Sequence, residues 1–212
     1  DEGDSPDDVA VLGGPFLGAE AVGNGLVRKH ELRSTYVALF PGVYLASPLK
    51  PTFAHRVEGA WLWSRRQGVV AGLAASRLYG AKWVDDTEPV ELAWTNARPP
   101  DGILTSALRL AAGEIVVLGR IPVTSLARTA FDLARRPPQS GAVARVDALG
   151  AAADFDCRDV LGLAARHRGK DRFDGDKYAA QALADGATAV VVRAGAAAAL
   201  PASAARTVVD DG

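Results

Sequence analysis

A short run of basic and aromatic side chains is the part of this sequence best suited to chemistry, and that chemistry is contact with nucleic acid. Arg28, Lys29, His30, Arg33 and Tyr36 all lie within nine consecutive residues. Lysine and arginine side chains neutralise phosphates, and arginine can also read the edge of guanine. We therefore take these five residues as the candidate DNA-binding residues.

The distribution of charge along the chain supports this interpretation. The net charge of the 212 residues is only −1, which argues against a general basic coat. Between Arg28 and Arg66, however, seven basic and two acidic side chains give a local charge of +5. A local basic region in a neutral protein is typical of a site-specific binder. A solvated helix face would have the same composition, so charge alone leaves both interpretations open.

The remaining reactive side chains are not spaced for catalysis or metal binding. His30, His55 and His167 lie far apart, and none has a second ligand at metal spacing. The chain contains no Gly-x-Ser-x-Gly turn to present a serine, and no glycine-rich loop with a lysine to bind phosphates. We predict no catalytic residue, no metal site and no cofactor, and hence a protein that is not an enzyme.

An acidic cluster is the nearest approach to a nuclease site. Asp85, Asp86, Glu88 and Glu91 could supply carboxylates, but a metal-dependent nuclease also needs a lysine to polarise the attacking water. Ala93 stands where that lysine would be. We interpret the cluster as a solvated loop leading into a strand.

The single cysteine and the hydropathy pattern indicate a cytoplasmic protein. Cys157 has no partner for a disulfide, which fits a reducing compartment, and its apolar helix face predicts a buried side chain. No apolar run approaches the length of a membrane span, and the N-terminus is acidic, unlike a signal peptide. We expect no membrane partner.

The candidate residues need a scaffold, and the surrounding pattern predicts a helix followed by a two-stranded ribbon. We expect a brief helical turn over 19–24, a helix over 28–36, and a ribbon over 40–45 that reverses at Pro41-Gly42. A recognition helix usually has a second helix bracing it, and 19–24 is short for that task. A helix and ribbon that only pack on the body therefore remain an alternative.

The rest of the chain predicts a body of alternating helices and strands and then a change of composition. Periodicity and capping residues, among them Thr52 and either Thr124 or Ser125, predict helices over 53–66, 74–79, 125–136, 141–150 and 156–167. Short strands are expected at 69–71, 90–94, 103–106, 115–118 and 121–123, forming a small, mostly antiparallel sheet. After Gly169 the chain is rich in alanine and glycine, with a helix near 176–184 and strands at 188–193 and 206–209.

These elements predict an α+β protein with four regions. Residues 1–15 are acidic and expected to be disordered, 16–50 form a small winged-helix-like head, and 51–169 form a mixed α/β body. Residues 170–212 form an α/β tail fragment.

Three blocks of sequence resemble the AbiEi-like antitoxins and transcriptional regulators of actinobacteria. They are Arg28–Arg33 with Phe40–Tyr44, Ala60–Trp63 with Val70–Ser76, and the long block Pro122–Leu133, so the resemblance covers about residues 16–169. It implies a winged-helix-like DNA-binding head on an α/β body and a role in type IV toxin–antitoxin autoregulation. The implied partners are double-stranded promoter DNA and a cognate toxin.

The tail resembles a different family. The stretches Arg172–Val192 and Val208–Asp211 are similar to part of the N-terminal UDP-sugar-binding domain of the Mur ligases. Because the chain has no lysine loop for ATP phosphates, we expect no ligase activity.

Three hypotheses follow. The first is a non-enzymatic antitoxin or transcriptional regulator that binds promoter DNA through Arg28–Tyr36 and the ribbon. The second is a protein-interaction module, contacting a toxin or its own copy near Trp61, Trp63 and Trp83. The third is an inactive remnant of a nuclease-associated or Mur-like protein.

Overall fold

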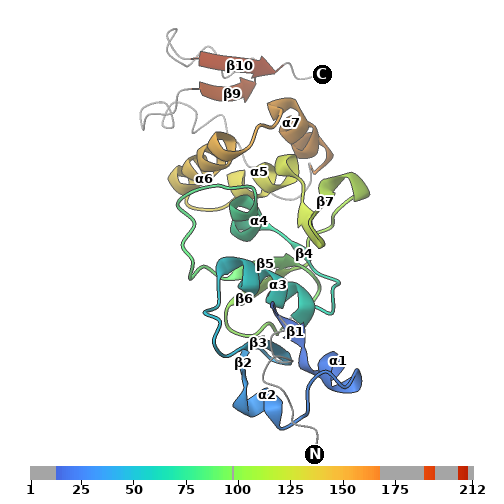
Figure 1. The fold of residues 1–212 in the computed structure, drawn as a ribbon. Helices are drawn as coiled ribbons and strands as arrows, with labels where there is room; N and C mark the ends of the chain where they lie inside the picture. The colour runs from blue at the N-terminus through green and yellow to red at the C-terminus, as the bar shows by residue number, and fades with distance from the viewer. Residues whose placement is uncertain (1–12, 97, 168–188, 194–204, 210–212) are drawn as a thin grey trace, which may run out of the picture.

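The computed structural model describes residues 13–96, 98–167, 189–193 and 205–209. Helices and strands both occur along these residues, which confirms the predicted α+β class (Figure 1). The first elements are β1 (Phe16–Leu17), α1 (Gly18–Gly23), α2 (Glu31–Ser34), β2 (Tyr36–Phe40) and β3 (Val43–Ala46). Next come α3 (Phe53–Trp63), β4 (Val69–Val70), α4 (Gly72–Leu78), β5 (Val90–Ala93), β6 (Ile103–Ser106), the 3-10 turn η2 (Ala112–Glu114), β7 (Ile115–Leu118) and β8 (Ile121–Thr124). The last are α5 (Leu126–Ala134), α6 (Gln139–Ala152), α7 (Cys157–Arg166), β9 (Ala189–Arg193) and β10 (Ala205–Val209).

The head is a three-stranded antiparallel sheet with two short helices. Its strand order is β1-β3-β2, so the first strand pairs with the far arm of the β2–β3 hairpin. The hairpin reverses at Pro41-Gly42, as predicted, and Gly42 has a φ of +79°, a conformation that favours glycine. The expected helical turn over 19–24 is α1.

The predicted helix over 28–36 is wrong in extent. Only Glu31–Ser34 is helical, and Tyr36 already belongs to β2, where it pairs with Ala46. A residue cannot form the backbone hydrogen bonds of a helix and of a strand at the same time, and Tyr36 forms those of the strand by pairing with β3. Arg28, Lys29 and His30 consequently lie in the turn before α2.

Helix α3 begins as predicted and ends earlier. The Thr52 hydroxyl accepts the His55 N–H at 3.2 Å, and the Thr52 N–H donates to His55 Nδ1 at 3.3 Å, so both ends of a capping box are present. The prediction extended this helix to Arg66. Arg65 and Arg66 instead have φ values of 56° and 63°, and this left-handed turn ends the helix at Trp63.

The body contains a five-stranded sheet of order β6-β5-β4-β8-β7. The prediction of a mostly antiparallel sheet is corrected, because β4–β5 and β7–β8 are antiparallel whereas β4–β8 and β5–β6 are parallel. Strand direction depends on which strands meet in space. The β4–β8 pair joins Val70 to Val123, and no local pattern specifies so distant a partner.

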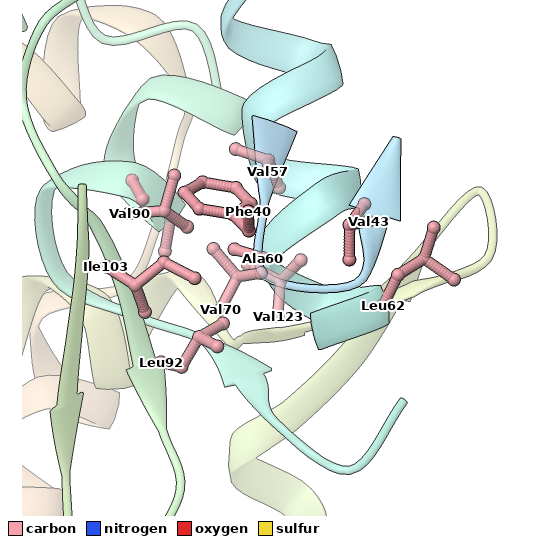
Figure 2. Close-up of a cluster of buried hydrophobic side chains, with 12 residues drawn as sticks. Phe40, Val43, Val57, Ala60, Leu62, Val70, Val90, Leu92, Ile103 and Val123 are labelled. Carbon is pink, nitrogen blue, oxygen red and sulfur yellow. The ribbon is translucent and has the colours of Figure 1, made fainter. Parts of the chain in front are cut away.

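One core cluster spans the hairpin of the head and the body, and a smaller, separate cluster lies within the head: Phe16, Ala21, Val27, Tyr36 and Ala46. Phe40 and Val43 of the hairpin pack with Val57 and Ala60 of α3, and the cluster continues to the sheet strands (Figure 2). Its other buried members are Leu62, Val70, Ala74, Ala75, Val90, Leu92, Ile103 and Val123. The approach is close at Gly59, where an added Cβ would lie 2.6 Å from the Leu39 side chain. The hairpin is therefore built into the body.

Helices α5, α6 and α7 pack together at the opposite end of the molecule from α2 (Figure 1). Ser125 caps α5 and Asp156 caps α7. In the tail β9 and β10 form a two-stranded parallel sheet, in agreement with the two predicted strands. The helix predicted near 176–184 and the acidic residues 1–12 lie outside the described residues.

Candidate nucleic-acid interface and buried ionic clusters

Four of the five candidate DNA-binding residues share one exposed surface of the head. Arg28, Lys29 and His30 form the turn before α2, and Arg33 lies in its last turn. All four side chains are exposed, and no residue of α2 itself is buried. We call this set, Arg28, Lys29, His30 and Arg33, the basic turn. It lies at the end of the molecule that α2 forms in Figure 1.

A backbone hydrogen bond shapes the basic turn. The Glu31 carboxylate accepts the Arg28 N–H at 2.6 Å, and the Glu31 N–H donates to the Arg28 carbonyl at 3.0 Å. Among the described residues, no carboxylate lies within ion-pair distance of the four basic-turn side chains. The positive charge of Arg28, Lys29 and Arg33 is therefore available to an anionic partner.

Tyr36 does not belong to this surface. Its side chain is only 8% exposed, and its ring meets the Phe16 ring edge-on at 5.0 Å between centroids. Burial raises the pKa of the Tyr36 hydroxyl, and the nearby Glu31 charge raises it further. A helix through residue 36 would have left this side chain exposed. In the strand β2 it points instead into the hydrophobic cluster of the head. We therefore leave Tyr36 out of the proposed contact set.

The rest of the local +5 charge is spread over the body. The Arg56 guanidinium donates to the Glu88 carbonyl at 3.0 Å, and Arg66 makes two 2.6 Å bonds to the Glu20 carboxylate. That ion pair joins α1 to the turn after α3. Lys50 and Arg65 are exposed. The local charge of +5 is therefore partly neutralised in the folded protein, because Arg66 pairs with Glu20 from outside this stretch.

The acidic cluster separates into a loop and a buried carboxylate. Asp85, Asp86 and Glu88 are exposed in the loop before β5, which confirms the loop interpretation for these three. Glu91 is instead buried in β5, where its carboxylate accepts the Leu73 N–H at 3.0 Å and pairs with the Arg136 guanidinium. Within the described part of the chain, no group of three or more potential ligands is placed to hold a metal ion.

A second ionic cluster is buried beneath α5 and was missed by sequence analysis. Arg128, 2% exposed, binds Glu114 at 2.5 Å, Asp132 at 2.9 Å and the Arg109 carbonyl at 3.0 Å. His167 approaches the other Glu114 oxygen at 3.5 Å and stacks on the Phe131 ring. The only sequence signal was the i,i+4 spacing of Arg128 and Asp132, because Glu114 lies in a separate segment.

The two carboxyls of this cluster have pKa values shifted in opposite directions. Burial raises the pKa of Asp132 above its usual value, since the hydrogen bond and charge of Arg128 offset only part of the desolvation. For Glu114, burial opposes ionisation too, but the bonds from Arg128, the Ala111 N–H and His167 together lower its pKa.

An open pocket of about 520 Å³ lies between the two ionic clusters. Its lining combines hydroxyl, carboxylate, guanidinium and apolar side chains: Glu91, Leu104, Thr105, Ser106, Leu108, Asp132, Arg135 and Arg136. Both carboxylates in this lining are bound by arginines, so the pocket presents no free pair of acids for acid–base work.

The three tryptophans proposed for protein contact do not form one surface. Trp61 and Trp63 pack against the core, and the Trp63 ring meets the Trp94 ring edge-on at 5.2 Å. Trp83 is 95% exposed and has a φ of +69°, which is unfavourable for a bulky side chain. Of these three tryptophans, Trp83 is the one exposed enough to offer an aromatic contact to a partner.

Cys157 and His167 lie at the two ends of α7. The prediction that Cys157 is buried is wrong, because it is the first residue of α7 and its side chain is exposed. The side chains that face inward on this helix come later, with Leu163 buried. His167 forms the C-terminal end of α7, as expected.

Comparison of the sequence with protein-family models and with curated proteins found no match. The resemblances to AbiEi-like regulators and to Mur ligases therefore stay predictions. Among the described helices, none has the length and apolarity needed to cross a membrane.

Proposed function

We propose that the protein is a non-enzymatic, DNA-binding regulator of the antitoxin type that contacts promoter DNA through the basic turn and the β2–β3 hairpin, in the cytoplasm. The observation that carries the proposal is the exposure of Arg28, Lys29, His30 and Arg33 on one surface, without a paired carboxylate among the described residues. Cationic side chains held this way release counterions when they meet phosphates, and this release is the main source of DNA affinity.

The arrangement of the head supports the same proposal. A short helix precedes an antiparallel hairpin, and β1 pairs alongside it, so the hairpin can act as a wing beside the helix. With only four residues, α2 can insert little into a major groove, and phosphate contacts should dominate over base reading. We therefore expect binding that is strongly salt-dependent and only modestly sequence-selective.

The decisive experiment compares two variants that remove the same charge. Arg28, Lys29 and Arg33 are changed to glutamine in one, and Lys82, Arg158 and Arg166, exposed residues of the body, are changed to glutamine in the other. Binding to DNA from the protein's own upstream region is measured by fluorescence anisotropy at several salt concentrations. We expect the first variant to lose at least about tenfold in affinity and to flatten the slope of log K against log salt by about 2–3.

The control variant should keep the wild-type affinity and slope, because its positive charges lie away from the basic turn. Equal losses in both variants would show that only overall charge matters and would contradict the proposal. Absence of wild-type binding at low salt would contradict it as well.

A protein-interaction role is the second candidate, and Trp83 is the observation that favours it. An almost fully exposed tryptophan in a left-handed backbone conformation is unusual unless a partner covers it. A complex with a toxin that persists at high salt and is lost on Trp83→Ala would support this role. Such a result together with no DNA binding would replace the first proposal.

A further inference from the structure

The two ends of the β2–β3 hairpin lie at different places in the molecule, and Figure 1 shows the hairpin between α2 and α3. At its open end, α2 leads through Thr35 into β2, and Tyr36 pairs with Ala46. Val27, the residue before the basic turn, packs in the same small cluster as Tyr36 and Ala46. The basic turn therefore lies at the open end of the hairpin.

The turn of the hairpin lies at the other end, against the body. The Gly42 carbonyl accepts the Gly18 N–H at 3.0 Å, and Phe40, beside the turn, belongs to the core cluster that continues into the body. Four strand steps separate Tyr36 from Phe40, which places the Pro41-Gly42 turn roughly 13 Å from the open end. The hairpin turn is therefore remote from the basic turn, although both of its residues are exposed.

The segment that leaves the hairpin at its open end is the loop after β3. We call residues 47–51 the proline loop, because Pro48 and Pro51 fix the φ angle at two of its positions. The Ser47 N–H donates to the Thr35 carbonyl, at the end of α2, at 3.1 Å. The other end of the loop joins the capping box of α3 at Thr52. The proline loop is thus held at both ends, and all five of its residues are exposed.

Lys50 is the one charged residue of the proline loop. The Leu49 N–H donates to the Ala46 carbonyl at 2.9 Å, and a turn closed in this way keeps the Lys50 Cα within about 11 Å of the Ala46 Cα. Among the described residues, no carboxylate lies within ion-pair distance of the Lys50 ammonium. Lys50 therefore adds an uncompensated positive charge near the open end of the hairpin, whereas the Pro41-Gly42 turn carries none.

We propose that the DNA duplex that meets the basic turn also meets the proline loop, with the Lys50 ammonium on a backbone phosphate, and that the Pro41-Gly42 turn makes no contact. This contact rests on the proposed DNA-binding function and names the second part of its surface. The charges favour DNA as the occupant, because a strand carries a phosphate about every 3.4 Å and one duplex can reach cations on both segments. The two prolines reduce the conformational entropy that the loop would lose on binding.

Two substitutions that change the net charge equally separate the loop from the hairpin turn. Lys50→Gln removes a positive charge from the proline loop, and Pro41→Glu adds a negative charge at the turn. In anisotropy titrations against the upstream DNA, we expect Lys50→Gln to flatten the slope of log K against log salt by about 0.9 and to lose about fivefold in affinity at about 0.15 M salt. Pro41→Glu should stay within about twofold of wild type, since the Debye length at this salt is about 8 Å. Lys50→Arg, which keeps the charge, should restore the wild-type slope.

Lysine protection tests the same contact in the protein without substitutions. Acetylation by acetic anhydride is followed at each lysine by mass spectrometry, with and without the upstream DNA. We expect bound DNA to slow the modification of Lys29 and Lys50 several-fold and to leave Lys82, an exposed lysine of the body, unchanged. Equal modification of Lys50 with and without DNA, while Lys29 is protected, would overturn the proposal.

The outcomes distinguish this contact from the proposed function itself. If the basic-turn variant loses DNA affinity while Lys50→Gln keeps the wild-type slope, the proline loop makes no contact and the proposed function stands. Equal losses in Lys50→Gln and Pro41→Glu, with unchanged circular dichroism spectra, would show that the loop is not distinguished from the turn and would also overturn the proposal. A wild-type protein that binds no DNA at low salt would overturn both.

Discussion

The arginine at position 128 connects the end of η2, helix α5 and the end of α7. Its guanidinium binds Glu114 and Asp132, and Glu114 in turn meets His167. The Arg128, Glu114 and Asp132 side chains are nearly inaccessible to water, whereas His167 is partly exposed. Each buried charge is therefore stabilised by its partner and not by solvent. Removing one member of a buried ion pair typically costs about 3–5 kcal/mol, and because Arg128 would keep Asp132 as a partner, we expect the loss of Glu114 to lie at the lower end of this range.

The variant Glu114→Gln should therefore destabilise the protein, and the loss should depend on pH. The pKa of Glu114 is lowered in the folded protein, so its contribution is fully present above the unfolded value near 4.5 and disappears as the pH falls through the lower folded value. We expect urea denaturation to show a difference of about 3 kcal/mol at pH 7 that shrinks steadily below about pH 4.5.

Asp132 is present in both proteins, so its own raised pKa largely cancels in this difference. Asp154→Asn, which removes an exposed carboxyl, is the control and should change the free energy of unfolding little at pH 7 or at pH 3. A Glu114→Gln difference that is constant from pH 7 to pH 3 would contradict the assigned role of the ionised carboxylate.

At the scale of elements, the turn from β4 into α4 shows why its sequence is so constrained. Gly72 has a φ of +58°, and a Cβ there would lie 2.3 Å from the Glu91 carboxylate and 2.6 Å from the Arg136 guanidinium. The same carboxylate accepts the Leu73 N–H at the start of α4. The positive φ therefore favours glycine at this position, and an added Cβ would also push aside the ends of the Glu91 and Arg136 side chains.

We predict that Gly72→Ala destabilises the protein by about 2–4 kcal/mol, because it adds left-handed strain and displaces a buried ion pair. Gly113→Ala is the matched control, since a Cβ there meets nothing within 4 Å and its φ is not positive. Thermal or urea unfolding of the two variants measures the difference. Equal stabilities would show that the turn rearranges without cost.

At the scale of the whole molecule, the head and the body unfold as one unit if they share one core. The sequence suggested a boundary near residue 50, yet Phe40 and Val43 of the head lie in the cluster that also contains Val57 and Leu92 (Figure 2). The Arg66–Glu20 ion pair adds a second connection at the surface. The hairpin that follows the basic turn is thus anchored in the body.

Phe40→Ala tests this coupling. We expect a loss of about 3–5 kcal/mol, with one transition seen both by tryptophan fluorescence of the body and by amide exchange in the head. Val37→Ala on the same strand, where the side chain is 49% exposed, should change the stability by less than about 0.5 kcal/mol. An unaltered tryptophan transition in Phe40→Ala would show that the head folds independently.

Features that depend on near neighbours along the chain could be predicted from the sequence alone. Thr52 and Ser125 begin their helices as expected, and Pro41-Gly42 forms the hairpin turn, because capping and turn conformations are decided within about four residues. The local density of charged side chains likewise predicted that the basic turn is exposed. These signals were sufficient to predict most of the strands and the approximate position of each helix in the body.

Contacts between side chains far apart in the sequence depend instead on how the whole chain packs. Tyr36 is buried because β2 pairs with β3. The buried Glu91 is paired with Arg136, which is 45 residues away along the chain but close in space. The parallel pairing of β4 with β8 depends on distant partners in the same way. Such contacts depend on burial and on the closure of long loops, and these are properties of the whole folded chain that no short window of sequence contains.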